Sequence, residues 1–176
     1  MNKSNRENPV QWLIIFAILL MTLSGCTQPQ PAALQAGEEP VVIRSVIADY
    51  DQVWDDLTMA LTSRGLVISS VSHVGEMLER TGKALNQNTK IFARANVMEF
   101  CSAVISRKMM EANPHYIAFC PYQIMVYSLP EEPEKIYLGY RRLIWAGVQD
   151  RQVLQAVETL LSGLIDEVVE TQNEYQ

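Results

Sequence analysis

The chain has 176 residues, of which 48% are hydrophobic and 19% charged, and its mean hydropathy is zero. These values exclude a disordered chain and a polytopic membrane protein, and the length fits one domain. The net charge of -6 argues against the broad basic face that nucleic-acid binding requires, so we expect no nucleic-acid partner. Two His and three Cys offer little material for a metal cage or for a disulfide-dense scaffold.

The N-terminal 25 residues have the order of a secretory signal. Lys3 and Arg6 precede the apolar run Trp12–Met21, which is too short for a membrane span of about 20 residues. The next segment, Leu23-Ser24-Gly25-Cys26, resembles the lipobox of bacterial lipoproteins. This resemblance implies that residues 1–25 are a cleaved signal peptide and that Cys26 is lipidated. The alternative is a signal anchor, or a cytosolic protein with an apolar start, in which this Cys is a coincidence.

A multiply acylated Cys26 would attach the protein to a membrane without a spanning segment. Thr27 occupies the position where inner-membrane members of the resembling lipoproteins often carry Asp, which favours the periplasmic face of the outer membrane in a host with two membranes. Residues 26–40 comprise the lipidated Cys and a Pro-containing flexible tether, which would hold the domain roughly 20 Å from its anchor on average. Removal of the signal leaves a net charge of -7, so the acyl chains must supply the membrane attachment.

Residues 41–176 are expected to form one small α+β domain. Hydrophobic periodicity and capping residues predict its elements in chain order. These are a strand over 41–46, a helix over Tyr50–Arg64 capped by Asp49, a strand over 66–72, a short helix around Glu76–Arg80, a strand over Lys90–Phe100, a helix that Ser102 caps and that ends before Asn113-Pro114, strands over Tyr122–Leu129 and Lys135–Trp145 joined by a turn at 130–134, and a long helix capped by Asp150. Without the short helix, the order is β-α-β-β-α-β-β-α, which predicts a mostly antiparallel sheet with helices on one face.

Several segments of this body resemble the domain-of-unknown-function family 302. The resemblance covers about Val42 to Leu143 and rests on Phe100-Cys101-Ser102-Ala103, on the helix end at Asn113-Pro114, on Cys120-Pro121 and on the following hairpin. Many family members have Gly-Asn-Pro after the Phe and Leu before the second Pro, so both departures introduce a Cys. The family implies a compact α+β fold. Because no general activity is established for it, the resemblance transfers no catalytic residue.

Cys101 and Cys120 are the only thiols that remain once Cys26 is lipidated. An even pair in an oxidising envelope is typical of one disulfide, which here would close a loop of about twenty residues. The competing interpretation is that both are buried small hydrophobic residues. Topology decides between them, because parallel neighbouring strands would place the two residues at opposite sheet edges. A reactive redox pair is disfavoured, since neither a C-x-x-C spacing nor an adjacent basic residue lowers a thiol pKa.

The other candidate chemistry is weaker. His73 and His115 are interpreted as solvated side chains rather than metal or haem ligands, although Cys120-Pro121 resembles a dipeptide of some haem-binding segments. Of Arg141 and Arg142, one is expected to face solvent and the other to pair with an acid or to bind an anion. We therefore expect neither a metal nor a cofactor.

The sequence thus predicts a non-enzymatic, membrane-anchored envelope lipoprotein whose domain is a non-catalytic binding module for a small ligand or another envelope protein. Two alternatives remain. One is a thiol/disulfide redox or haem-related accessory protein that uses Cys101 and Cys120, and the other is a purely structural protein.

Overall fold

The computed structural model describes residues 39–143 and 151–175, with Arg151 described by its backbone alone. The chain divides into two compact units, residues 1–37 and 38–176, and the described residues all belong to the second. The predicted signal peptide, Cys26, Trp145 and the predicted helix cap Asp150 lie outside the described residues. In the part of the chain that is described, no helix has the length and apolarity that a membrane span needs.

Five antiparallel strands form one sheet in the order β1-β5-β4-β3-β2. The strands are β1 (Val41–Ile47), β2 (Val67–Ser72), β3 (Arg94–Cys101), β4 (Tyr122–Leu129) and β5 (Glu132–Arg141). Gly139 lies where β5 pairs with β1. A Cβ atom on Gly139 would be 2.6 Å from the Val42 carbonyl oxygen, so this close approach of the two strands needs glycine. The predicted α+β class and antiparallel sheet are confirmed.

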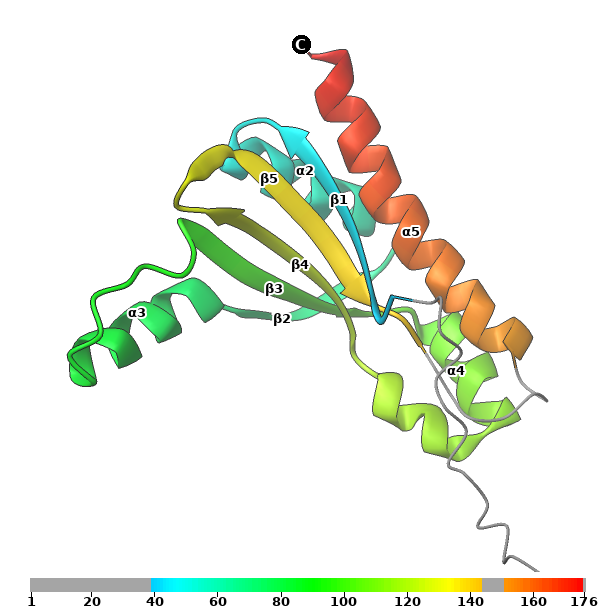
Figure 1. Cartoon of the computed structure of the whole chain (residues 1–176). Helices are drawn as coiled ribbons and strands as arrows, with labels where there is room; N and C mark the ends of the chain where they lie inside the picture. Colours follow the sequence, from blue (N-terminus) through cyan, green and yellow to red (C-terminus); the bar gives the residue numbers. More distant parts are fainter. Residues whose placement is uncertain (1–38, 144–150, 176) are drawn as a thin grey trace, which may run out of the picture. The chain divides into compact units, whose positions relative to one another are not determined.

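Four α-helices and one 3-10 helix are described between and after the strands (Figure 1). They are α2 (Tyr50–Ser63), α3 (Val74–Ala84), α4 (Ala103–Ala112), η1 (Pro114–Phe119) and α5 (Arg151–Glu174). The predicted caps hold: the Asp49 carboxylate accepts from the backbone N–H groups of Asp51 and Gln52, and Ser102 Oγ accepts from Ile105 N. Gly65 follows α2 with φ +69°, the left-handed conformation that ends many helices.

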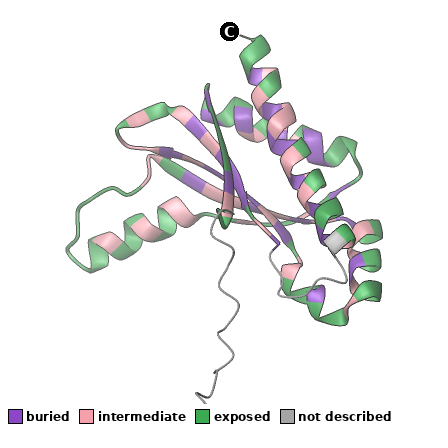
Figure 2. Ribbon diagram, turned by 45° about the vertical axis from the view of Figure 1, so that its right-hand side comes forward, coloured by how far each residue is buried: buried purple, intermediate pink, exposed green. Residues whose placement is uncertain are grey.

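The core lies between the sheet and the helices α2, α4 and α5. Alternate residues of each inner strand point into it, as the pairs Met98–Ile124 and Phe100–Tyr122 illustrate. The apolar stripe of α5 supplies Val157, Leu161 and Ile165, all almost fully buried. In Figure 2 the buried residues follow the sheet and the inward side of α5. Among the described residues, the buried members of this core run from Val42 to Val168.

Helix α3 differs from the other helices because its main packing partner is a single strand, β3. A Cβ on Gly75 would lie 3.0 Å from Ala95 N, and Ala95 is buried although it is outside the main core cluster. Alternation places Ala95 on the face opposite Asn96, so the first turn of α3 meets β3 outside the main core. The predicted α+β domain, an antiparallel sheet with helices, is confirmed.

The structure corrects several predicted boundaries. The short helix expected around Glu76–Arg80 is the full helix α3, which adds an element to the predicted order. Strand β3 begins at Arg94 rather than Lys90. Strand β5 begins at Glu132, because Leu129 already pairs with Glu132 and the reversal uses only Pro130 and Glu131. The segment that follows Asn113 forms the 3-10 helix η1, and the Asn113 side chain accepts a hydrogen bond from His115 N in its first turn.

Candidate functional site

A cleft of about 340 Å³ lies on the helix-covered side of the sheet, beside its β2 edge. It is lined by residues from α2, from β2 and the residue after it, and from β3: Tyr50, Asp51, Trp54, Val71, His73, Arg94 and Asn96. Small-molecule sites in proteins typically occupy about 300–1,000 Å³ and combine apolar walls with a few convergent polar groups. This cleft has both properties.

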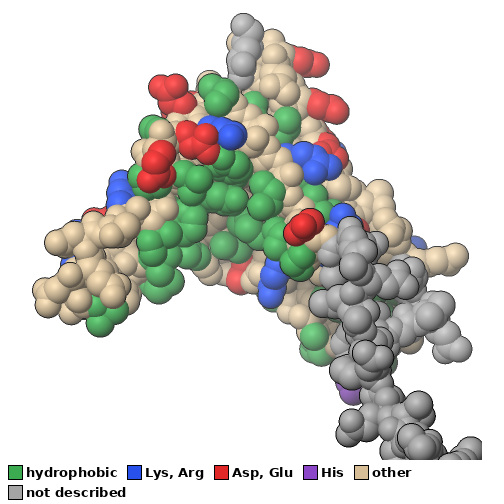
Figure 3. Space-filling model, in the orientation of Figure 1, with side chains coloured by type: hydrophobic (Ala, Val, Ile, Leu, Met, Phe, Trp, Pro, Cys, Tyr) green, Lys and Arg blue, Asp and Glu red, His purple; other side chains and the backbone are tan. Residues whose placement is uncertain are grey.

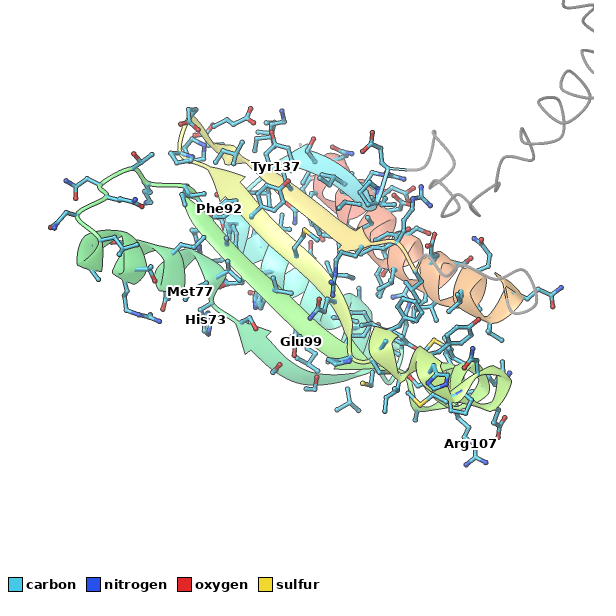
Figure 4. All side chains as sticks on the ribbon, turned by 60° about the horizontal axis from the view of Figure 1, so that its bottom comes forward. His73, Met77, Phe92, Glu99, Arg107 and Tyr137 are labelled. Carbon is cyan, nitrogen blue, oxygen red and sulfur yellow. The ribbon has the colours of Figure 1, made fainter. Side chains whose placement is uncertain are left out.

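Local structure explains why these side chains converge. The Asp49 cap fixes the start of α2, so Tyr50, Asp51 and Trp54 lie in its first turns. The pleat of β3 places Arg94 and Asn96 on the core side, in the same row as Met98. His73 lies where the chain passes from β2 into α3 (Figure 4).

A chain of hydrogen bonds runs from the core to His73. The buried Tyr50 hydroxyl donates to the Val126 carbonyl at 3.0 Å and accepts from Asn96 Nδ2 at 3.1 Å. The side-chain oxygen of Asn96, Oδ1, is then left to accept a hydrogen bond from His73 Nδ1 at 3.0 Å. Because that oxygen can only accept, Nδ1 carries the proton, and a neutral His73 keeps the lone pair of Nε2 for a further partner.

Arg94 is held in place by two neighbours. Its Nη2 donates to Asp51 Oδ1 at 2.7 Å, and its guanidinium carbon lies 3.9 Å from the centre of the Tyr50 ring. This ion pair lowers the pKa of Asp51 and raises that of Arg94. Burial raises the pKa of Tyr50, so its phenol stays protonated at neutral pH. The guanidinium is therefore a fixed positive charge at the wall of the cleft.

Arg94 and Tyr50 also line a second, more open cleft of about 460 Å³. Its other walls are the β1–α2 connection, from Ile47 to Asp49, and the hairpin residues Pro133 and Glu134. The Arg94–Tyr50 pair therefore forms a partition that both clefts share.

The open face of the sheet carries an aromatic cluster. The Tyr127 and Tyr137 rings stack with centroids 5.0 Å apart, and the Phe92 ring meets Tyr127 edge-on at 5.6 Å. Phe92 and Tyr137 lie on the same side of the sheet in Figure 4, and Figure 3 shows hydrophobic side chains gathered over this face. At its rim, Gln123 accepts from Arg141 and donates to Glu99, both at 2.9 Å. This surface is apolar with a polar rim.

The structure brings Cys101 and Cys120 together at the end of the sheet where β3 finishes and β4 begins. The two strands are antiparallel neighbours, so the parallel arrangement that would separate the residues does not occur. Both are free thiols, and each is partly exposed. Burial and the neighbouring Cys120 raise the pKa of Cys101.

The remaining predicted site residues are not gathered into one place. His115 is exposed in η1, far along the chain from the cleft that holds His73. Arg142 donates to Glu158 at 3.1 Å, whereas Arg141 is exposed. Among the described residues, no group of three or more His, Cys, Asp or Glu side chains is arranged to hold a metal ion.

The sequence interpretation missed the cleft, although a signal for it was present. In the predicted β3 row, Arg94 and Asn96 share one face with Met98 and Phe100, so a cation and an amide occupy positions that otherwise face the core. Buried polar groups need partners, so such a row predicts a polar network beneath the covering helix. His73 was interpreted as a solvated side chain, and it is exposed, but its ring orientation is set by Asn96.

Comparison with known proteins identifies the domain. The crystal structure of an uncharacterized conserved DUF302 protein from Bacillus stearothermophilus matches with a TM-score of 0.61 and 15% sequence identity. The match covers 73% of this chain and 98% of that chain, so the shared fold accounts for nearly all of the Bacillus protein. No curated protein matches the sequence. The model of the family described as Domain of unknown function DUF302 matches residues 42–170, and the chain belongs to this family.

Proposed function

We propose that the protein is a lipid-anchored envelope lipoprotein whose DUF302 domain is a non-catalytic module that binds a small organic acid in the Arg94 cleft. The observation that carries the binding role is the convergence of Arg94, Asn96 and His73 on one cleft with an apolar wall. The anchor is supported by the lipobox-like Leu23–Cys26 and by the tether that follows it.

The shape and chemistry of the cleft favour an acid with an apolar body. Trp54 and Val71 offer apolar surface, on which a ring or short aliphatic chain can pack. Arg94 already gives one donor to Asp51 and keeps the other donors of its guanidinium for a ligand carboxylate. The lone pair of His73 Nε2 can accept a hydrogen bond from a hydroxyl or amine of the same ligand.

The same network supports binding rather than catalysis. The Tyr50 hydroxyl is already engaged with Val126 and Asn96, and burial keeps its pKa above the ordinary value. The residues that line the cleft include no serine, threonine or cysteine that could act as a nucleophile beside His73.

Binding can be followed through Trp54 fluorescence. The chain contains only three Trp, and Trp12 belongs to the predicted signal peptide, so Trp145→Phe makes Trp54 the only indole of the mature protein. We expect 3-phenylpropionate to change this fluorescence saturably, and the uncharged 3-phenylpropanamide to bind at least about ten-fold more weakly, because it lacks the charge-assisted hydrogen bond. Equal affinity for the acid and the amide would contradict the assignment of Arg94.

Three variants locate the bound acid. Arg94→Gln should weaken binding about ten-fold or more, and Asp51→Asn should strengthen it, because Arg94 then faces no competing carboxylate. Glu134→Gln lies in the second cleft and should leave Kd within about two-fold, as for ordinary surface changes. If Glu134→Gln changes Kd more than Arg94→Gln does, the ligand site is wrongly placed.

The anchor is tested separately. Cys26→Ala should abolish lipidation and leave an uncleaved precursor in the inner membrane, whereas mass spectrometry of the mature wild-type protein should show an acylated N-terminal Cys. An unmodified terminus would refute the anchor and leave the binding proposal standing.

A further inference from the structure

The two thiols at the β3–β4 end of the sheet are placed for a covalent bond. Phe100 pairs with Tyr122 across the antiparallel strands, so the next residue, Cys101, lies beside the Cys120-Pro121 step. Continued by one residue, this register places Cys101 opposite Pro121, so Cys120 is one residue away from the directly opposite position. A disulfide spans Cα separations of about 4.4–6.8 Å. Cys120 is near enough to raise the pKa of Cys101, and both side chains are partly exposed to solvent.

A short hydroxyl chain reaches Cys120. Ser106 Oγ lies 3.3 Å from Cys120 Sγ and 3.0 Å from the Tyr122 hydroxyl. Burial raises the pKa of Tyr122, so its hydroxyl stays protonated and can donate to Ser106. Ser106 is then free to donate a hydrogen bond to Cys120 Sγ. Burial and the adjacent sulfur raise the pKa of Cys101.

We propose that Cys101 and Cys120 are a site of oxidative modification at which the protein accepts a disulfide from a low-molecular-weight disulfide. The Cys120 thiolate attacks the donor disulfide, forms a mixed disulfide and releases one donor thiolate. The Cys101 thiolate then attacks Cys120 Sγ and releases the second donor thiolate. The protons of the two protein thiols pass to the two released thiolates, so one disulfide and two thiols become one protein disulfide and two donor thiols.

The bond would tie down the segment that it encloses. Residues 102–119 contain α4 and η1, whose Met109 and Tyr116 are buried in the core, and α4 contacts α5. Closing this loop restricts the unfolded chain, so the oxidised protein should melt several degrees above the reduced protein. Amide exchange should slow in α4 and η1 more than in α3, which lies outside the loop.

Residues 39–176 suit the test, because they contain every buried member of the described core and no Cys besides Cys101 and Cys120. The matched fold also covers 98% of the Bacillus protein. The reduced protein is incubated with oxidised glutathione, denatured without reductant, alkylated and weighed by mass spectrometry. We expect a product that is lighter by two hydrogen atoms, takes up no alkylating reagent and retains no glutathione. Two alkylated thiols, or glutathione that stays attached to the wild-type protein, would overturn the proposal.

Variants separate the two steps. Cys101→Ala should stop at a stable mixed disulfide on Cys120, because the resolving thiol is missing. Ser106→Ala should form the same final product several-fold more slowly, whereas Ser45→Ala, on an exposed position of β1, should react at the wild-type rate. Equal rates for Ser106→Ala and wild type would refute the role of the hydroxyl chain, and the wild-type mass measurement decides the disulfide itself even if a Cys variant fails to fold.

Discussion

At the residue scale, Tyr50 joins the fold to the candidate site. Tyr50 is the first residue of α2, and its buried ring lies against the Arg94 guanidinium. Its hydroxyl links the β4 backbone at Val126 to the Asn96 side chain. One side chain therefore satisfies a core carbonyl and orients the amide that holds His73. Such a chain cannot be read from the spacing of the residues, since Tyr50, His73 and Asn96 come from three separate elements.

Tyr50→Phe should lower the free energy of unfolding by about 1–3 kcal/mol, because it removes the hydrogen bonds of the Tyr50 hydroxyl to the Val126 carbonyl and to the Asn96 side-chain amide. Urea denaturation measures the change. Tyr175→Phe is the matched control, because Tyr175 is 73% exposed and its change should stay within about 0.5 kcal/mol. Equal effects of the two substitutions would mean that the Tyr50 hydroxyl does not contribute to the free energy of unfolding.

At the element scale, periodicity predicts the elements that face the core on one side. The stripe on α5, the alternation in β4 and the caps Asp49 and Ser102 all agree with the structure. Helix α3 was predicted only in part: it has few apolar residues, and none of its residues is buried. That Cys101 and Cys120 lie at the same end of the sheet could not be read from the sequence, because it depends on which strands are neighbours.

Leu161 tests the α5 stripe. Leu161→Asp places a carboxylate where the native side chain is only 2% exposed, and the loss should reach several kcal/mol of a total stability usually near 5–15 kcal/mol. We expect circular dichroism to show an unfolded or partly folded domain at room temperature. Ala156→Asp, on the exposed side of the same helix, should remain folded. An unchanged melting temperature for Leu161→Asp would contradict the packing of α5.

At the scale of the whole molecule, ion pairs connect elements that are distant in sequence. Arg44 on β1 pairs with Asp166 on α5 at 2.9 Å, and Arg64 after α2 pairs with Glu167 on α5. All these side chains are partly exposed, so each pair contributes modestly. Together they connect α5 to β1 and to the residue that follows α2.

Two of the ion pairs, Arg64–Glu167 and Arg94–Asp51, make the stability of the fold depend on pH. Arg64 lowers the pKa of Glu167, and Arg94 lowers that of Asp51. A carboxyl whose pKa is lower in the folded state stabilises the fold above its unfolded pKa, near 4, and this contribution is lost as the pH falls through the folded pKa. The melting temperature should therefore fall on acidification below about pH 4, and Glu167→Gln should show a shallower fall. Identical acid slopes for Glu167→Gln and wild type would show that the pair does not stabilise the fold.

The cleft connects the three scales, because it exists only where the β3 row, the start of α2 and the residue after β2 meet. Nuclear magnetic resonance of isotope-labelled residues 39–176, titrated with 3-phenylpropionate, tests its role most directly. The account predicts that the largest shifts occur at the Trp54 indole N–H, the His73 imidazole and the Arg94 guanidinium, and that they saturate together. Shifts that centre instead on Tyr127 and Tyr137 of the open sheet face, or spectra that do not change, would contradict it.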